Sequence, residues 1–385
     1  MPSPFVLPDH LARLSPLYGQ VQTGPGLYRL FEQGLLQPWG AFQQTSDVGL
    51  GALLSADEFL ALLRGLADDL LLPIAGSDAA VESKPEHASP RVLAAIRSLY
   101  PDADSGLRPD KSGTHPWPSD ESPMQDRLIV IVGAGRSGTT WLEELLLAYD
   151  DMGGLSGHET WLFHQLRHLW RNFTGESGPG IGEWIDRQDF IAALRRFCDG
   201  VLTAAQRRHS PDTRFYIEKT PAHVERLPEI AAVYPDAWVI HLVRDGRDVA
   251  RSMSQVPFFG VPDIRDAATL WARAVGTVRR DASRVPRFRE VRYESLHADP
   301  ATVLHELRDW VHAEAAPDPA LLADAITRRV SAHGGTARPV GPDSWRSLPS
   351  RELAAIYAAA GDELVRTGYA SRAQMWRARL RGPKR

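Results

Sequence analysis

Two continuous apolar runs mark the second half of the chain. Residues 128–132 are Leu-Ile-Val-Ile-Val, and residues 238–243 are Trp-Val-Ile-His-Leu-Val. Runs without polar alternation are typical of strands that are buried on both faces, as in parallel sheets. Apolar residues at helical spacing, including Trp141, Leu142 and Leu145, follow the first run. Strands that alternate with helices predict an α/β fold, a parallel sheet flanked by helices.

The same reasoning places the other elements of this part of the chain. Further strands are predicted at 214–218 and 288–293. Helices are predicted at 138–148, 161–173 and 187–205, before residue 233, from residue 248 to residue 254, and as a terminal helix at 353–367.

The N-terminal part has a different pattern. Residues 1–104 show helical periodicity and predict a smaller, mainly helical N-terminal domain. Residues 105–125 are dense in Pro, Gly, Ser and Asp and predict a linker, so that the larger domain spans 126–385. The residue order within 57–103 echoes that within 188–237. This echo indicates either a partial duplication or a chance similarity of turns that flank helices.

Composition narrows the function classes. The 385 residues carry a formal net charge of −4, with 43% hydrophobic and 24% charged residues, which gives no sign of a nucleic-acid partner. Cys198 is the single cysteine, so an internal disulfide is excluded. Residues 1–18 lack the apolar core of a signal peptide, and no apolar run approaches the roughly 18 residues that span a bilayer. We expect a cytoplasmic protein with no membrane partner.

The segment 133–142 joins the first strand to the first helix through a glycine-rich turn. Free backbone N–H groups and the positive end of a helix dipole would both point at a ligand in such a turn, which predicts a phosphate site. Gly133 and Gly138 have the spacing of a nucleotide-triphosphate loop, but Thr139 stands where that loop has lysine. This argues against ATP or GTP hydrolysis. Arg136 supplies a cation instead, although a turn that merely packs a helix on the sheet remains an alternative.

A second cationic segment, 244–252, follows the strand at 238–243. Ligands of α/β sheets bind at the carboxyl ends of the strands, so Arg244 lies where a guanidinium can meet a phosphate. Ser252 is about two helical turns further along and can donate to the same group. Two anion sites on one sheet edge suggest a ligand with phosphates at both ends. The alternative is a solvated cluster of Arg and Asp that caps a helix.

Both motifs together resemble a known family. Gly-Arg-Ser-Gly-Thr-Thr-Trp-Leu at 135–142 and Val-Arg-Asp-Gly-Arg-Asp-Val-Ala-Arg-Ser at 243–252 are similar to the sulfotransferases that use 3′-phosphoadenosine-5′-phosphosulfate (PAPS). The resemblance covers about residues 126 to 370, including segments 291–296 and 341–346. It implies a P-loop-like sheet and a bacterial-type soluble member of the glutamate-base branch, which includes tyrosylprotein and glycan sulfotransferases.

The resemblance also implies the cofactor site. Arg136 to Thr140 would hold the 5′-phosphosulfate, Arg244 and Ser252 the 3′-phosphate, and Tyr293 would lie near the adenosine. No metal is implied, because backbone amides and arginine neutralise the phosphates, and the product would be adenosine-3′,5′-bisphosphate. The predicted cofactor-binding residues are Gly135, Arg136, Ser137, Gly138, Thr139, Thr140, Trp141, Arg244, Ser252 and Tyr293.

The predicted catalytic residues are Glu159, Lys219, Arg136 and His158. The resemblance places a catalytic glutamate at Glu159, while the adjacent His158 remains the alternative base because the cytosolic branch uses histidine and the imidazole titrates near neutrality. Lys219 resembles the lysine that such enzymes aim at the leaving oxygen, the alternative being a structural salt bridge. His241 and His223 are expected to be structural.

The expected reaction is in-line transfer of the sulfuryl group from PAPS to a hydroxyl of a small molecule or natural product. Glu159 would accept the hydroxyl proton, and Arg136, Lys219 and the loop hydroxyls would stabilise the charge on the bridging oxygen. Two alternatives are a sulfotransferase-like binding or regulatory protein without turnover and a P-loop phosphotransferase, which the missing lysine disfavours. The pattern predicts neither the acceptor nor the oligomeric state.

Overall fold

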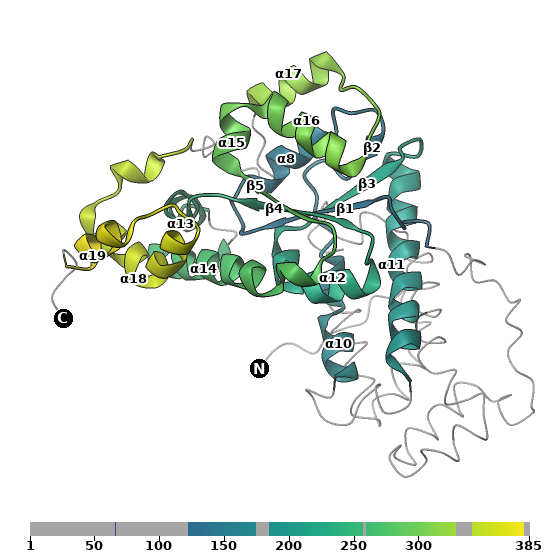
Figure 1. Ribbon diagram of the computed structural model, residues 1–385, viewed down its shortest axis with the longest axis horizontal. Coiled ribbons are helices and arrows are strands. Elements are labelled where there is room, and N and C mark those ends of the chain that lie inside the picture. Colours follow the sequence, from purple (N-terminus) through teal and green to yellow (C-terminus); the bar gives the residue numbers. More distant parts are fainter. Residues whose placement is uncertain (1–65, 67–121, 175–184, 257–258, 329–340, 381–385) are drawn as a thin grey trace, which may run out of the picture. The chain divides into compact units, whose positions relative to one another are not determined.

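The computed structural model describes Leu66 and residues 122–174, 185–256, 259–328 and 341–380 (Figure 1). Contacts divide the chain into two compact units. The larger unit contains the described residues of 126–159, 209–231 and 235–385. The smaller unit contains the other described residues. The predicted N-terminal domain, linker and duplication lie outside the described residues, apart from Leu66 and the last residues of the linker, and stay predictions.

The larger unit is built on a five-stranded sheet in the order β2-β3-β1-β4-β5, in which every pairing is parallel. The strands are β1 (Leu128–Gly133), β2 (Met152–Gly153), β3 (Phe215–Lys219), β4 (Trp238–Val243) and β5 (Phe288–Arg292). Every residue of β1 and β4 is buried, as the continuous apolar runs predict. The predicted parallel sheet is therefore confirmed.

Helices flank both faces of this sheet (Figure 1). One face carries α8 (Thr139–Leu146), α15 (Tyr293–Ala298), α16 (Pro300–Val311) and α17 (Pro319–Arg328). The other elements of the larger unit are η5 (Pro221–Arg226), α12 (Leu227–Val233, whose last residues belong to the smaller unit), α13 (Gly246–Ser254), α14 (Ile264–Asp281), η7 (Ala282–Arg284), η8 (Ser344–Ser347), α18 (Ser350–Arg366) and α19 (Arg372–Leu380). Helix α14 packs against α13 and α18.

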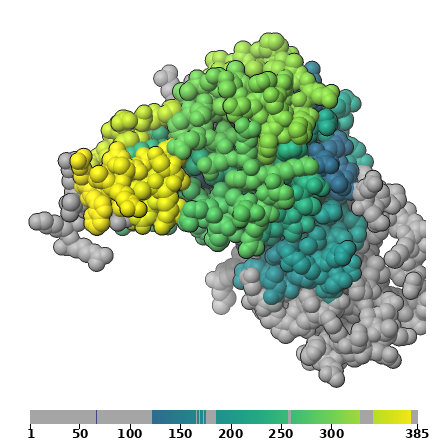
Figure 2. All heavy atoms as spheres, viewed as in Figure 1, coloured from purple at the N-terminus to yellow at the C-terminus, as the bar shows by residue number. Residues whose placement is uncertain are grey.

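The core beneath α8 is formed by apolar side chains of the strands and of the helices on that face, among them Ile131, Leu145, Ile217, Leu242 and Leu304. On the face that Figure 2 shows, the blue segment near residue 150 is visible only in small areas beside the green segments. All residues of β1 and most residues of α8 are buried, so the glycine turn joins two buried elements.

The smaller unit contains α9 (Leu162–Gln165), α10 (Arg167–Phe173) and most of α11 (Arg187–His209). The helical stretch predicted at 161–173 is confirmed, and the structure divides it into two short helices, α9 and α10. The buried carboxylate of Asp199 on α11 accepts hydrogen bonds from Ser122 Oγ at 2.7 Å and Tyr234 OH at 2.8 Å.

Two predicted boundaries near the C-terminus also differ. The strand predicted at 288–293 ends at Arg292, because Tyr293 begins α15. The helix predicted as terminal is followed by α19, which starts with a capping box that the sequence reading missed. Ser371 Oγ accepts from Gln374 N at 3.2 Å, and the Gln374 side chain accepts from Ser371 N at 2.8 Å. Among the described helices, none is long and apolar enough to cross a bilayer.

Candidate functional site

The glycine-rich turn runs from the end of β1 at Gly133 to the start of α8 at Thr139. It contains two residues with positive φ, Arg136 at 70° and Gly138 at 98°. Ser137 N donates to the Ala134 carbonyl at 3.1 Å and tightens the turn. Gly138 is the N-cap of α8 and makes no side-chain cap, so the first backbone N–H groups of the helix have no such partner.

Aromatic rings pack closely against two glycines of this turn. A Cβ atom at Gly138 would lie 2.7 Å from the Tyr293 ring, and one at Gly135 would lie 2.7 Å from the Phe259 ring. Ser137 Oγ is buried and has no hydrogen-bond partner among the described residues. The turn therefore has the features of an anion cradle: close backbone packing, free amides and an unused hydroxyl.

Arg136 and Arg244 converge beside this turn. Arg136 Nε donates to Ser252 Oγ at 3.1 Å, and Arg244 Nη1 donates to the Arg136 carbonyl at 3.4 Å. The Arg244 guanidinium lies 4.3 Å from the centroid of the Tyr293 ring. Burial and the neighbouring Arg244 charge lower the pKa of Arg136. Neighbouring cations of this kind favour an anion between or beside them.

The structure adds a contact that the sequence analysis did not predict. The Ser252 hydroxyl, expected to share a phosphate with Arg244, accepts a hydrogen bond from Arg136. Arg136 thus contacts both residues of the second predicted anion site. The Trp141 indole is used in packing, since its Nε1 donates to the Ala325 carbonyl at 3.0 Å.

Helices α14 and α13 hold Arg244 and the segment 341–347, respectively. Trp271 Nε1 of α14 donates to the Arg244 carbonyl at 3.0 Å. The Asp248 carboxylate accepts from Asp343 N at 3.0 Å and from Trp345 N at 2.8 Å. Arg244 Nη2 also donates to the Gly341 carbonyl at 3.4 Å. The segment that the resemblance connects with the nucleotide therefore lies beside the second arginine.

Glu159 and Lys219 form a buried ion pair. Lys219 Nζ lies 3.4 Å from Glu159 Oε1, and the side chains are 0% and 6% exposed, respectively. Burial raises the pKa of Glu159, while the Lys219 charge opposes this rise. His158 is exposed. Gly157 lies between this pair and the first turn of α8. Lys219 Nζ donates to the Gly157 carbonyl at 3.4 Å, and a Cβ atom at Gly157 would lie 3.6 Å from the Thr140 methyl group.

Comparison with known proteins agrees with this geometry. The family model described as "Sulfotransferase family" matches residues 129–317. By this match the chain is similar to the sulfotransferase family.

Relatives and solved structures cover different shares of the chain. Protein-tyrosine sulfotransferase 1 of Danio rerio is 27% identical over 158 residues, 39% of this chain and 43% of that protein. Protein-tyrosine sulfotransferase 2 of Gallus gallus is 25% identical over 193 residues, 48% of this chain and 50% of that protein. The chain thus spans about half the length, or less, of these curated relatives. The sulfotransferase domain of the Synechococcus olefin synthase is 18% identical, with a TM-score of 0.39, and covers 64% of this chain and 97% of that domain.

The site also contains Glu143, which the sequence analysis did not predict. Its side chain is 0% exposed, and Oε2 lies 3.8 Å from Lys219 Nζ. A signal was available, since Glu143 is four residues after Thr139 and therefore lies on the same face of the helix. In the sequence Glu143 stands between apolar residues at helical spacing, a position typical of the solvent-facing side of an amphipathic helix.

The two histidines expected to be structural are both buried. His223 Nδ1 lies 2.8 Å from Glu218 Oε2, the buried carboxylate of β3. His241 Nδ1 lies 3.0 Å from Glu290 Oε2, and this contact lowers the pKa of Glu290. Within the described residues, no group of three or more His, Cys, Asp or Glu side chains could hold a metal ion.

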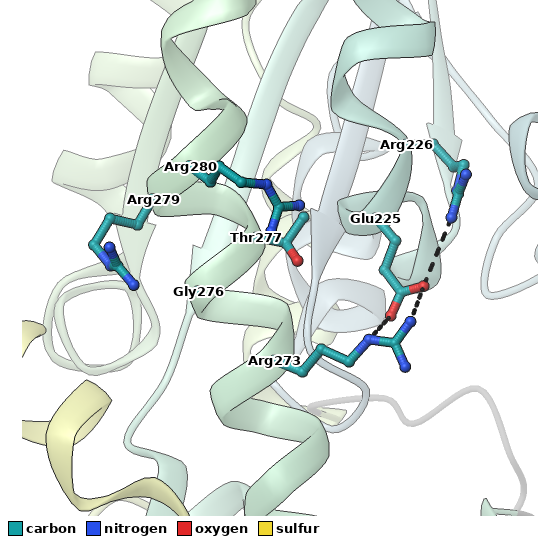
Figure 3. Close-up of a pocket in the computed structure, with 7 residues that line it drawn as sticks. All are labelled: Glu225, Arg226, Arg273, Gly276, Thr277, Arg279 and Arg280. Atoms are coloured by element: carbon teal, nitrogen blue, oxygen red, sulfur yellow. Dashed lines mark hydrogen bonds and ion pairs between the residues drawn. The ribbon is translucent and has the colours of Figure 1, made fainter. Parts of the chain in front are cut away.

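A separate pocket of about 430 Å³ lies between η5 and α14. Figure 3 shows Arg226 and Arg273 both reaching Glu225, while Arg279 points away from them. Arg273 Nε lies 3.0 Å from Glu225 Oε1, and Arg226 Nη1 lies 2.9 Å from Glu229 Oε1. The carboxylates of Glu225 and Glu229 thus pair with Arg273 and Arg226 in this pocket, which weakens it as an anion site.

Proposed function

We propose that the chain transfers a sulfuryl group from PAPS to a hydroxyl group of an acceptor. The observation that carries this proposal is the buried Lys219–Glu159 pair, beside Gly157 and a glycine turn in which Arg136 supplies the cation and Thr139 stands at the lysine position of a nucleotide loop. A turn for phosphate and a buried base next to a cation are the two parts that the transfer needs.

The residues of the turn fit the donor. In the proposed arrangement the backbone amides at 137–140, the Ser137 hydroxyl and Arg136 hold the 5′-phosphosulfate. Arg244 holds the 3′-phosphate, and the Tyr293 ring, already in contact with Arg244, lies beside the adenosine. The donor supplies an activated sulfuryl group when it is bound. The buried Arg244 guanidinium binds a phosphate more strongly than it would in water, because little solvent competes with it.

Glu159 is the proposed general base. Burial raises the pKa of Glu159 towards pH 7. A carboxylate with a higher pKa is a stronger base and accepts the acceptor proton with a larger driving force. Lys219 keeps the carboxylate ionised before the reaction and stabilises negative charge as the acceptor proton moves to Glu159. The exposed His158 has no comparable pairing with Lys219 among the contacts described, which supports the glutamate over the histidine.

The acceptor is proposed to be a hydroxylated small molecule or natural product. The test is incubation of the chain with ³⁵S-labelled PAPS and a panel of alcohols and phenols, with a tyrosine-containing peptide included because curated relatives are named for protein tyrosine. Labelled product that needs both chain and acceptor is expected. Bisphosphate binding without any labelled product would favour the alternative, a binding or regulatory protein of this family.

A further inference from the structure

Glu143 is a fully buried acid at the centre of the site, and the proposed reaction does not use it. Its Oε2 accepts a hydrogen bond from Gly157 N at 3.0 Å and lies 3.8 Å from Lys219 Nζ. Its Oε1 is buried without a hydrogen-bond partner among the described residues. Burying a carboxyl oxygen without a hydrogen bond lowers the stability of the fold. Such a group in a native structure therefore needs an explanation, such as a functional role.

The contacts of Gly157 indicate this role. Glu143 binds the amide N–H of Gly157, and Lys219 binds its carbonyl at 3.4 Å, so both polar groups of this residue are held. Gly157 has a φ of +84° and is two residues before Glu159. Fixing Gly157 therefore fixes the chain that presents Glu159 to Lys219.

We propose that Glu143 is a positioning residue that, in its neutral form, holds Gly157 and leaves Lys219 to Glu159, and that its ionisation draws Lys219 away and slows turnover at alkaline pH. The part of this inference that concerns turnover rests on the proposed function. It concerns a residue that neither contacts the proposed phosphate positions nor serves as the base.

Several charged groups surround Glu143. Burial raises its pKa to about 8, while Lys219 and the bond from Gly157 oppose the rise, and the charges of Glu144 and Glu218 reinforce it. The buried Tyr216 of β3 is also electrostatically coupled to Glu143. The raised pKa favours the neutral form of Glu143 at pH 7, and the charged form gains as the pH passes about 8.

The experiment compares three variants with the wild-type chain. Glu143→Gln imitates the neutral acid, Glu143→Ala removes the partner of Gly157 N, and Glu144→Gln is the matched control. Glu144 is the adjacent residue, and it binds Ser156 Oγ at 2.8 Å in the same loop. Amide hydrogen exchange at Gly157 is the first readout: Glu143→Ala should lose protection, whereas Glu143→Gln and Glu144→Gln should keep it. Unchanged protection in Glu143→Ala would overturn the positioning role.

Turnover of ³⁵S-labelled PAPS is the second readout. We expect Glu143→Gln to match the wild type near pH 7 and to lack the alkaline decline, Glu143→Ala to lose ~10–10²-fold in kcat, and adenosine-3′,5′-bisphosphate affinity to stay within about twofold in both. An identical alkaline decline in Glu143→Gln would overturn the proposed effect of ionisation. If no acceptor in the panel gives product, the proposed function fails, while hydrogen exchange still decides the role of Glu143.

Discussion

Replacing Gly138 by alanine should damage both the stability of the larger unit and its anion site. Gly138 has a φ of 98°, in the left-handed region where L side chains are strained. A Cβ there would lie 2.7 and 2.8 Å from two carbons of the Tyr293 ring. That ring is 3% exposed and packs edge-on against Trp141, so it cannot move without disturbing the core.

The cost has two parts. The backbone strain of a non-glycine residue is worth ~1–3 kcal/mol, and overpacking in a close-packed core costs a further ~1–3 kcal/mol. The free energy of unfolding should fall by ~2–6 kcal/mol if both apply in full. Displacement of the Tyr293 ring would also move Arg244, which lies 4.3 Å from its centroid.

Denaturant unfolding followed by tryptophan fluorescence measures the change, and Gly276→Ala is the matched control. Gly276 lies within α14, and the nearest atoms to a Cβ there are 3.9 Å and 4.0 Å away. Alanine at this helical position should stabilise by up to ~1 kcal/mol. The two substitutions should therefore have opposite signs. A Gly138→Ala variant as stable as Gly276→Ala would refute the account of the turn.

Three further substitutions probe the buried charges. Glu159→Gln should lower turnover ~10²–10⁴-fold in a radiolabel assay while calorimetry finds bisphosphate affinity unchanged; near-full turnover would exclude Glu159 as the base. Lys219→Met should reduce kcat ~10²–10³-fold and, because the Lys219 charge lowers the pKa of Glu159, move the acidic limb of the pH profile upward; an unmoved limb would contradict their coupling. For Glu143, the pKa of about 8 in the folded chain against 4.5 means that the folded state retains a proton that the unfolded state releases, so stability is lost as the pH rises from about 4.5 to about 8. Relative to Glu143→Gln, the wild type should lose up to about 5 kcal/mol over this range in denaturant titrations, and a constant difference would contradict the raised pKa.

The strands and the glycine turn could be predicted because their signals are local. A continuous apolar run such as 238–243 specifies a buried strand without knowledge of its neighbours. The spacing of Gly133, Gly138 and Arg136 identifies the turn, and the structure brings Arg136, Arg244 and Ser252 to it. Pairing of distant segments was accessible only through the rule that carboxyl ends of parallel strands share one edge.

The remaining features depend on contacts that the sequence does not encode locally. Glu143 looks like any acid on an amphipathic helix until β3 places Lys219 beneath it. Ser252 has no sequence signal that distinguishes Arg136 from Arg244 as its partner. The apolar pattern continues through both α9 and α10, so periodicity alone could not locate the break between them.

The central claim is that Arg136 and Arg244 recognise the two phosphates of one nucleotide. Isothermal titration of the chain with adenosine-3′,5′-bisphosphate, AMP and ATP tests it most directly, with Arg244→Ala as the second protein. We expect the bisphosphate to bind at least ~10-fold more tightly than AMP or ATP, since charged hydrogen bonds are worth ~1.5–3 kcal/mol, and Arg244→Ala to bind bisphosphate and AMP alike. Equal affinities for the three nucleotides in the wild-type chain, or an undiminished preference in Arg244→Ala, would contradict the claim.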